Sequence, residues 1–328
     1  MATTRPRRSL VNETAKYRSG ILFGLVAYLC WGLVPAYFVQ LKGVPPLEIL
    51  AHRICWSIII LAGLALVTGS WRDILRVLGT LRLVLTLCFS AILLTVNWLL
   101  YIYATVNGAV AEASLGYYMM PLVNAFLATV FLGEKLRPLH YPALGLVAFG
   151  VAIPFAISGT FTWLAVAVPI TFGCYGLVRK RIAVDSATGL TIESLIMVGP
   201  SLGFLLWQQF QGVGKFGNEL TLDCWLAFGG VVTVVPLLTF TLSLRRLPLL
   251  ANSFIQFLSP TMQLLVAVYW IGEVVPPERW IAIGFVWVAV VIFIADAVLQ
   301  VRSKRLPRPV IASMPRFHQP QAKASTLP

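Results

Sequence analysis

The sequence predicts an all-α polytopic membrane protein of ten transmembrane helices, arranged as two inverted five-helix repeats. Three observations point to this class. The 328 residues are 59% hydrophobic and only 11% charged, with a mean hydropathy of +0.85, whereas about a quarter of the residues in a soluble domain are charged. Long apolar runs recur along the chain. A pattern of matching residues also returns after 139 positions.

Ten apolar runs account for the predicted helices, since about 20 helical residues cross the roughly 30 Å of hydrocarbon in a bilayer. They lie at about 20–39, 47–67, 83–103, 111–132, 139–157, 163–178, 190–210, 224–243, 250–271 and 280–299. The sixth run is short and contains Pro169. The first run follows a basic stretch but lacks a small-x-small cleavage pattern, so it is predicted to be a retained helix rather than a signal peptide.

The distribution of basic residues predicts the orientation of these helices. If the N-terminus is cytoplasmic, the inward-facing segments carry 21 of the 25 Lys and Arg residues, and the outward-facing segments carry only Lys42, Lys215 and Arg279. Loops rich in Lys and Arg remain on the cytoplasmic side. Both termini are therefore expected in the cytoplasm. The net charge of +13 then reflects topology, and no nucleic-acid partner is expected.

Two copies of one unit, residues 20–158 and 159–299, are predicted from internal similarity. The matching positions are Pro121/Pro260, Ala128/Ala267, Gly133/Gly272, Glu134/Glu273, Pro138/Pro277, Ala143/Ala282 and Gly145/Gly284. Five spans per copy is an odd number, so the second copy must enter the membrane from the opposite side. A disordered basic cytoplasmic arm is expected at 1–19 and a disordered basic cytoplasmic tail at 300–328.

Polar and aromatic residues at mid-membrane depth predict a cavity between the repeats. Pro121 and Pro260 lie midway along the fourth and ninth runs, where each proline removes a helical hydrogen bond. The freed carbonyls must be buried or must line a cavity. The predicted cavity residues are Trp31, Tyr37, Asn97, Trp98, Tyr101, Tyr117, Tyr118, Pro121, Asn124, Tyr175, Pro236, Gln256, Pro260 and Gln263. Rings and neutral amides suit a small organic solute better than a bare ion, although each amide could instead bond between helices.

Few charged residues fall within the predicted spans. Glu48, His52 and Arg53 lie in the first two turns of the second run, while Glu112 and Glu193 open the fourth and seventh runs. Two interpretations stay open for them. The carboxylates can be held by helix N-termini, or the charges can form gating ion pairs, chiefly through Arg53. No carboxylate lies at mid-span, so a proton relay is not indicated.

Gly133-Glu134 and Gly272-Glu273 end the fourth and ninth runs. A glycine after a helix is a common C-cap, and a glutamate before the next helix can act as its N-cap. These pairs are therefore predicted to be structural hinges.

The sequence offers no motif for a metal or a cofactor. The three histidines form no helix-spaced pair and the five cysteines show no C-x-x-C spacing, so neither a zinc site nor a redox site is expected. A G-x-x-x-x-G-K-[ST] loop is also missing from the sequence, which argues against ATP hydrolysis by this chain.

Six motifs in order give the chain a family resemblance. They are Trp31-Gly-Leu-Val-Pro-Ala-Tyr-Phe, Glu48-Ile-Leu-Ala-His52-Arg53 with Trp56-Ser57, Asn97-Trp98-Leu-Leu, Glu112-Ala-Ser-Leu-Gly-Tyr117, Phe131-Leu-Gly-Glu134 and Tyr175-Gly-Leu-Val-Arg-Lys. From about residue 20 to 299, the chain resembles the RarD subfamily of EamA transporters, in the drug/metabolite transporter (DMT) superfamily. The resemblance implies a ten-helix carrier of the bacterial inner membrane with a central cavity. One departure is Met120, where the family pattern usually has Asn beside the fourth-span proline.

The function expected is secondary transport of a small organic metabolite or amphipathic drug, by alternating access at the central cavity, with export as the expected direction. The partners expected are this solute and the lipid bilayer, and a homodimer remains open. Two alternatives from other classes are a membrane enzyme that modifies lipid and a scaffold that does not transport. The enzyme would need a catalytic cluster near one interface, for which only Glu48, His52 and Arg53 come close.

Overall fold

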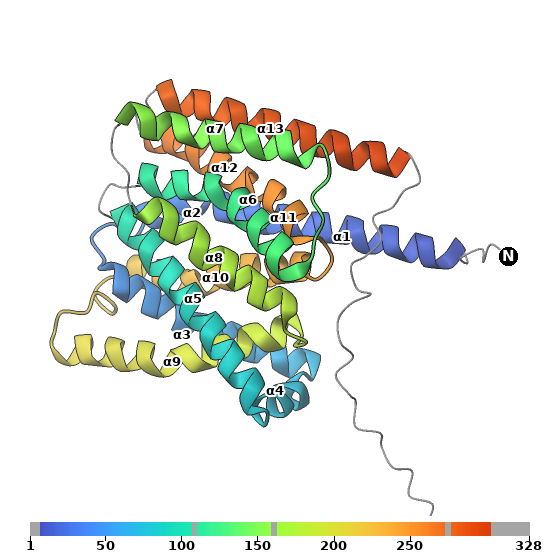
Figure 1. Ribbon diagram of the computed structural model, residues 1–328. Helices are drawn as coiled ribbons and strands as arrows, with labels where there is room; N and C mark the ends of the chain where they lie inside the picture. The colour runs from blue at the N-terminus through green and yellow to red at the C-terminus, as the bar shows by residue number, and fades with distance from the viewer. Residues whose placement is uncertain (1–6, 107–109, 159–162, 273–276, 303–328) are drawn as a thin grey trace, which may run out of the picture.

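The structure is a computed structural model that describes residues 7–106, 110–158, 163–272 and 277–302. These residues form helices and no strands (Figure 1). The helices of the first half are α1 (Arg7–Gly32), α2 (Val34–Val39), α3 (Pro46–Thr68), α4 (Trp71–Leu78), α5 (Leu81–Val106), α6 (Val110–Leu132) and α7 (His140–Ser158). Those of the second half are α8 (Leu164–Arg181), α9 (Ser186–Phe210), α10 (Leu220–Leu244), α11 (Leu249–Gln256), α12 (Leu258–Val266), the π-helix η1 (Ala267–Ile271) and α13 (Pro277–Arg302).

The prediction of an all-α polytopic membrane protein is confirmed. Within the described residues, 6 helical segments are long and apolar enough to cross a membrane. They are 15–39, 46–68, 81–104, 186–210, 220–244 and 249–270. Shorter apolar helices cover 117–132, 140–154 and 280–296. The sixth predicted run corresponds to α8, which belongs to neither group and ends in three consecutive basic residues, Arg179 to Arg181.

The expectation of a disordered arm at 1–19 is wrong from Arg7 onward, because α1 begins at that residue. The stretch from Arg7 to Ser19 contains neither proline nor glycine, so no residue that disfavours a helix interrupts it. The basic residues therefore extend the first transmembrane helix beyond its apolar run.

Two of the predicted spans are broken helices. In the ninth span α11 ends at Gln256 and α12 begins at Leu258. The break follows from Pro260, whose ring has no N–H to donate and clashes with the carbonyl four residues earlier, that of Gln256. In the first span α1 ends at Gly32 and α2 begins at Val34, and Pro35 lies four residues after Trp31. Pro121, by contrast, lies inside the continuous helix α6.

The main contacts join helices of the first half to helices of the second. Helix α7 packs against α13, α10 against both α3 and α1, α6 and α5 against α8, and α9 against α3. Helix α1 also packs against α12. The largest hydrophobic core, which includes Tyr28, Trp98, Tyr175 and Phe240, accordingly draws residues from both halves. A second core lies between α6, α7, α11 and α13 and contains Val147, Phe254 and Val286.

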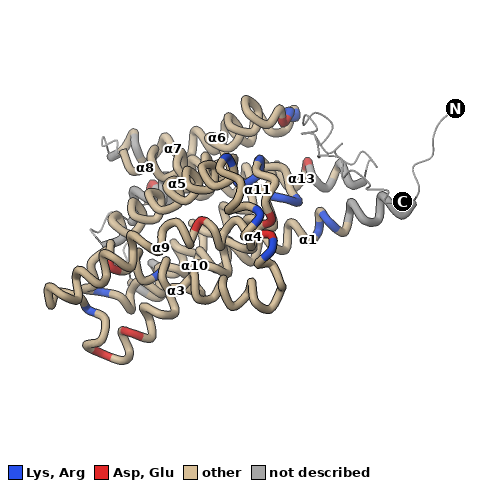
Figure 2. The backbone as a smooth tube through the Cα atoms, turned by 90° about the horizontal axis from the view of Figure 1, so that it is seen from below, with Lys and Arg blue, Asp and Glu red and all other residues tan. Residues whose placement is uncertain are grey.

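The bundle has one end at which α4 and the turn between α10 and α11 lie, called here the basic end. Lys and Arg residues gather there (Figure 2). The first residues of α1 and the last residues of α13 extend in the same direction (Figure 1). That arrangement fits an even number of spans.

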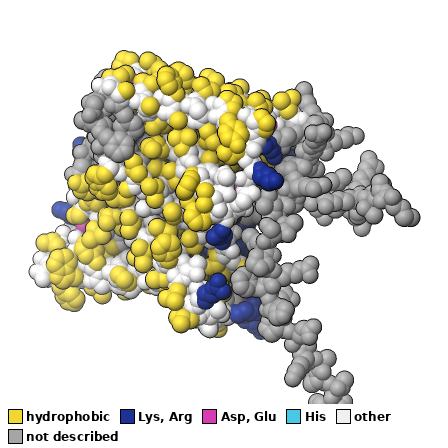
Figure 3. Space-filling model, in the orientation of Figure 1, with side chains coloured by type: hydrophobic (Ala, Val, Ile, Leu, Met, Phe, Trp, Pro, Cys, Tyr) yellow, Lys and Arg dark blue, Asp and Glu magenta, His cyan; other side chains and the backbone are white. Residues whose placement is uncertain are grey.

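The face seen in Figure 3 is largely apolar between the charged ends. Large side chains lie exposed on several helices, among them Phe126, Phe149 and Trp207, which are 61%, 58% and 54% exposed. A soluble monomer rarely exposes apolar patches larger than a few hundred Å². This surface is suited to contact with lipid.

Candidate functional site

A cavity lies in the interior of the bundle between the two halves of the chain. Its walls enclose about 490 Å³ of empty space, a volume that includes the open mouth. Between the side chains themselves there is room for only a few water molecules. The described residues that line it are Tyr28, Trp31, Val34, Arg53, Asn97, Trp98, Tyr101, Tyr117, Phe172, Gln256, Ser259 and Gln263. They come from α1, α2, α3, α5, α6, α8, α11 and α12.

Seven of the predicted cavity residues line this space: Trp31, Asn97, Trp98, Tyr101, Tyr117, Gln256 and Gln263. Arg53 lines it too, although the sequence placed it among the gating charges. Sequence reasoning missed Tyr28, Val34, Phe172 and Ser259. Ser259 could have been found, because it adjoins Pro260 and lies between the two predicted glutamines. Tyr28, Val34 and Phe172 look like ordinary core residues in sequence.

The other predicted cavity residues are not among those lining this space. Tyr118 stacks on Phe257, with ring centroids 6.2 Å apart, and belongs to the second hydrophobic core. Tyr175 is fully buried against Phe240, and the Asn124 amide donates to the Ser253 hydroxyl at 2.8 Å. The remaining members are Tyr37, Pro121, Pro236 and Pro260, all buried. Met120 is also fully buried and lies outside the lining.

Gln263 supplies a hydrogen bond that a backbone carbonyl of the opposite half lacks. Pro35 has no N–H, so the Trp31 carbonyl lacks its helical donor. The Gln263 Nε2 donates to that carbonyl at 3.1 Å. The buried Gln263 Oε1 has no hydrogen-bond partner among the described residues. Gln256 lies on the same helical face and lines the cavity, and its side-chain amide also has no hydrogen-bond partner among the described residues.

Asn97 has an interhelical role, as the alternative interpretation of the amides allowed. Its Nδ2 donates to the Val168 carbonyl at 2.9 Å and lies 3.0 Å from the Thr171 hydroxyl. These bonds join α5 to α8 at the wall of the cavity. Tyr117 and Tyr101 meet edge to face beside them, with centroids 5.6 Å apart, so this wall is formed of rings.

Arg53 is the one cation among the described lining residues, and it is 3% exposed. Its Nε donates to the Thr233 hydroxyl at 2.9 Å, and its guanidinium carbon lies 4.5 Å from the centroid of the Trp98 ring. A Cβ on Gly229 would fall 2.9 Å from the Arg53 Cγ, so this glycine leaves space for the side chain. No described carboxylate forms an ion pair with Arg53.

Glu48 and His52 are directed elsewhere. A Glu48 carboxylate oxygen accepts the backbone N–H of Lys215 at 2.7 Å. The His52 ring stacks on Phe216, with centroids 4.8 Å apart. Both residues therefore hold the loop between α9 and α10. Because Arg53 contacts Thr233 and Trp98 instead, the three residues do not converge on one point.

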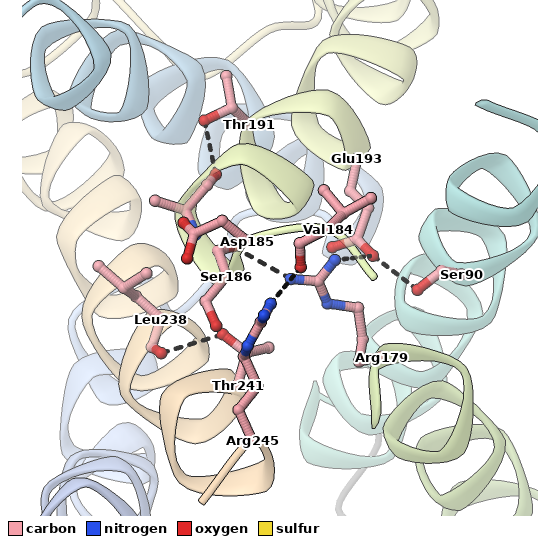
Figure 4. Close-up of polar contacts among 11 residues, drawn as sticks. Ser90, Arg179, Val184, Asp185, Ser186, Thr191, Glu193, Leu238, Thr241 and Arg245 are labelled. Carbon is pink, nitrogen blue, oxygen red and sulfur yellow. Dashed lines mark hydrogen bonds and ion pairs between the residues drawn. The ribbon is translucent and has the colours of Figure 1, made fainter. Parts of the chain in front are cut away.

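Glu193 forms a buried ion pair with Arg179, whereas the gating interpretation placed such pairs chiefly through Arg53. Their nearest atoms, Arg179 Nη1 and Glu193 Oε1, lie 3.7 Å apart, and both side chains are 2% exposed. The Ser90 hydroxyl donates to the same carboxylate oxygen at 2.6 Å. Figure 4 shows Arg179 reaching from α8 between Glu193 and the Ser186 carbonyl, to which it also donates. The side chain of Glu112 lies outside the described residues.

Glu134 caps a helix other than the one expected. Its carboxylate accepts the backbone N–H groups of Leu249 and Leu250, at 2.9 and 3.4 Å. These are the first residues of α11, whose N-cap position is Pro248 and has no side-chain acceptor. The prediction that Glu134 caps the following helix, α7, is thus wrong. Its place after Gly133, which has a φ of +65°, directs it toward the other half of the chain.

Polar contacts close the basic end of the cavity. Tyr28 lies in the lining and its hydroxyl accepts from the Asn252 amide at 2.7 Å. The Ser243 hydroxyl lies 2.8 Å from both the Asn252 Oδ1 and the Gly20 carbonyl. Lys180 donates to the Leu244 and Leu247 carbonyls at 3.1 and 2.5 Å and lies 3.8 Å from Glu134. Three of these contacts link the two halves: Tyr28 with Asn252, Ser243 with Gly20, and Lys180 with Glu134.

A bundle of apolar helices around a polar, aromatic-lined cavity defines a multi-pass membrane protein of the transporter type. Residues 18–155 match the EamA-like transporter family. A solved crystal structure superposes with a TM-score of 0.67 at 18% identity, over 85% of this chain and 99% of that one; this likeness concerns the fold alone.

Two curated relatives extend the likeness over nearly the whole chain. Protein RarD of Salmonella typhi is 39% identical over 293 residues, which cover 89% of this chain and all of that protein. A protein of Vibrio cholerae described as an uncharacterized transporter is 39% identical over 280 residues, or 85% of this chain and 93% of its own. The chain belongs to the RarD subfamily of the DMT superfamily. It is a membrane transporter of the DMT type.

Proposed function

We propose that the protein is a secondary carrier that moves a small organic solute across the bacterial inner membrane by alternating access, with export as its direction. The observation that carries this proposal is the cavity itself. Its walls come from both halves of the chain, and neutral amides and aromatic rings supply most of its surface. A site enclosed by two halves can be opened to either side by moving one half against the other.

The contact pattern supports two repeats related by a two-fold axis. If the halves are matched span by span, the α6–α8 contact corresponds to the contact of α1 with α11 and α12, and the α1–α10 contact corresponds to α5–α8. Helix α11 begins at Leu249 and α6 at Val110, and these positions differ by the 139 residues of the sequence repeat. Exchange of the halves thus preserves these interhelical contacts.

The closed basic end supports a gated cavity. Tyr28 and Glu134 accept hydrogen bonds across the halves at this end, and Lys180 lies 3.8 Å from Glu134 of the other half. Because these are hydrogen bonds at helix ends rather than a continuous apolar core, they can be exchanged for water or for other partners at modest cost. The cavity holds only a few water molecules in this conformation, so loading a solute requires the halves to separate.

The lipid-modifying enzyme has less support. Its candidate cluster was Glu48, His52 and Arg53, and these side chains bind a loop backbone, stack on Phe216 and face the cavity, respectively. A catalytic group needs its partner within hydrogen-bond reach. The scaffold alternative gives no reason for a buried polar cavity.

A crosslinking experiment tests alternating access. Asn124 on α6 and Ser253 on α11 touch across the halves at 2.8 Å. With both changed to cysteine in a background without the native cysteines, a bifunctional thiol reagent should hold the halves together and stop flux of labelled aromatic solutes, neutral and anionic, in proteoliposomes. A reductant-cleavable linker should restore flux on reduction. A matched pair within α4, Asp73→Cys with Arg76→Cys, joins residues already in contact and should leave flux unchanged.

Two results would contradict the proposal. One is solute flux that continues with the α6–α11 pair fully crosslinked. The other is a loss of flux when the α4 pair is crosslinked. That result would mean that the reagent stops flux by modifying the protein, not by joining the halves. Inverted membrane vesicles test direction, because an exporter should accumulate the solute inside them.

A further inference from the structure

Arg53 is a buried cation that has no ion-pair partner among the described residues. Its guanidinium is buried, yet its hydrogen bonding is confined to one bond, from Nε to the neutral Thr233 hydroxyl. Removing an isolated ion from water is costly unless a partner of opposite charge is present. Elsewhere in the described chain the deeply buried Arg179 has Glu193 beside it. A buried cation without an acid beside it can therefore be stabilised by pairing with an anion.

The two Nη groups of Arg53 donate no hydrogen bond to a described residue. Arg53 lines the cavity, whereas its Nε is occupied by Thr233. Trp98 lies 4.5 Å from the guanidinium carbon and Phe38 lies 5.9 Å from it. Rings so placed limit the rotation of a guanidinium, and a fixed guanidinium binds a planar carboxylate through two parallel hydrogen bonds.

The other residues that line the cavity indicate what kind of molecule could carry the anionic group. Trp31, Trp98, Tyr101, Tyr117 and Phe172 present rings, against which a flat apolar group packs favourably. No carboxylate is found among the described lining residues, so they offer an ammonium group no ion-pair partner, whereas Arg53 offers one to an anion. Gln256 and Gln263 supply neutral polar atoms that are not fully used.

We propose that the substrate is a small organic monocarboxylate with a flat, apolar body, held by its carboxylate on Arg53 and by its body among the rings of Trp31, Trp98 and Tyr117. The inference rests on the proposed carrier function and names the chemical class of its solute. Arg53 can pair with any anion, so an inorganic anion such as chloride is the alternative ligand that the test must exclude.

The test compares phenylacetate with phenylacetamide, which has the same shape without the charge. Binding to the purified full-length protein in nanodiscs is measured by calorimetry and by thermal unfolding in low-salt buffer, and each variant is compared with its own ligand-free form. The wild type should bind phenylacetate about tenfold or more tightly than phenylacetamide, as a charged hydrogen bond provides. Arg53→Gln should abolish this preference and Arg53→Lys should retain part of it. The control Arg76→Gln, at an exposed ion pair, should leave it intact.

Three results would overturn the assignment. The wild type could bind the acid and the amide equally; the preference could survive Arg53→Gln; or chloride alone could stabilise the protein as much as phenylacetate, with no further effect of the acid. If Arg53→Gln fails to fold, the Arg53→Lys variant provides the comparison. Flux of neutral solutes separates this inference from the carrier proposal: if the α6–α11 crosslink blocks such flux but no carboxylate preference exists, the carrier stands and the assignment to carboxylates fails.

Discussion

At the scale of single residues, polar side chains of one half repair the helix ends and breaks of the other. Gln263 bonds the carbonyl that Pro35 leaves free on Trp31, across 232 positions of sequence. Glu134 bonds the first N–H groups of α11, across 115 and 116 positions. Unpaired backbone groups are costly where water is scarce. These side chains therefore contribute to both stability and the fit of the halves.

The capping role of Glu134 leads to a prediction about stability. Glu134→Ala removes the acceptor for two N–H groups and the negative charge at the helix N-terminus, and loss of a cap typically costs about 0.5–2 kcal/mol. The variant should melt at a lower temperature than the wild type in a thermal unfolding assay. Glu134→Gln retains an acceptor oxygen and should fall between the two. An alanine variant as stable as the wild type would show that the carboxylate does not cap α11.

Much of the cavity could be predicted from the sequence, but the partners of its residues could not. An amide facing lipid is costly, and this argument correctly directed Gln256 and Gln263 inward. The sequence gives no sign that Gln263 bonds Trp31 or that Asn97 bonds Val168, because these contacts depend on how distant helices cross. Tyr118 and Tyr175 were assigned to the cavity by residue type alone, and they instead pack in hydrophobic cores.

At the scale of helices, close crossings depend on glycine. A Cβ on Gly230 of α10 would fall 2.8 Å from both the backbone carbon and the Cβ of Trp56 on α3, a separation that real side chains essentially never show. On Gly203 of α9 a Cβ would meet nothing within 4 Å. Both glycines lie inside long helices, so they form a matched pair.

Alanine at the two glycines should have opposite effects. Gly230→Ala forces α10 away from α3, and overpacking of this kind costs about 1–3 kcal/mol. Gly203→Ala adds no clash and gains about 0.5–1 kcal/mol of helix preference. Thermal unfolding should therefore show a lower melting temperature for the first variant and an equal or higher one for the second. Equal effects of the two substitutions would mean that the α3–α10 crossing does not depend on Gly230.

The helices themselves were predictable, whereas their breaks were only partly so. Apolar runs located every long helix, because burial in lipid demands about 20 apolar residues whatever the packing. Pro260 and Pro121 looked equivalent in sequence, yet α11 ends at Gln256 while α6 continues through Pro121. A proline can be absorbed when neighbouring groups satisfy the freed carbonyl, and those neighbours are set by tertiary structure. The break after Gly32 is not among the predictions, although Pro35, which removes a hydrogen bond there, is visible in the sequence.

At the scale of the whole molecule, the charge distribution predicts how the bundle sits in the membrane. Thr80 follows α4 at the basic end, and Asn218 lies in the loop between α9 and α10 near the other end; both are exposed. With the positive end in the cytoplasm, a membrane-impermeant thiol reagent applied to intact cells should label Asn218→Cys and not Thr80→Cys, in a background without native cysteines. Permeabilised cells should label both. Labelling of Thr80→Cys alone in intact cells would reverse the predicted orientation.

Most helices of the first half pack against helices of the second half, and this has a consequence for how the protein is synthesised. A ribosome delivers α1 to α7 before α8 exists, and the closest companions of these helices, from α8 to α13, are still to be synthesised. The early helices must therefore stay in the lipid while Arg53 lacks Thr233 and Asn97 lacks Val168 and Thr171. Their final positions are reached only when the last described helix, α13, arrives beside α7, so a truncated chain should be recognised by quality-control proteases as an orphan rather than persist as half a carrier.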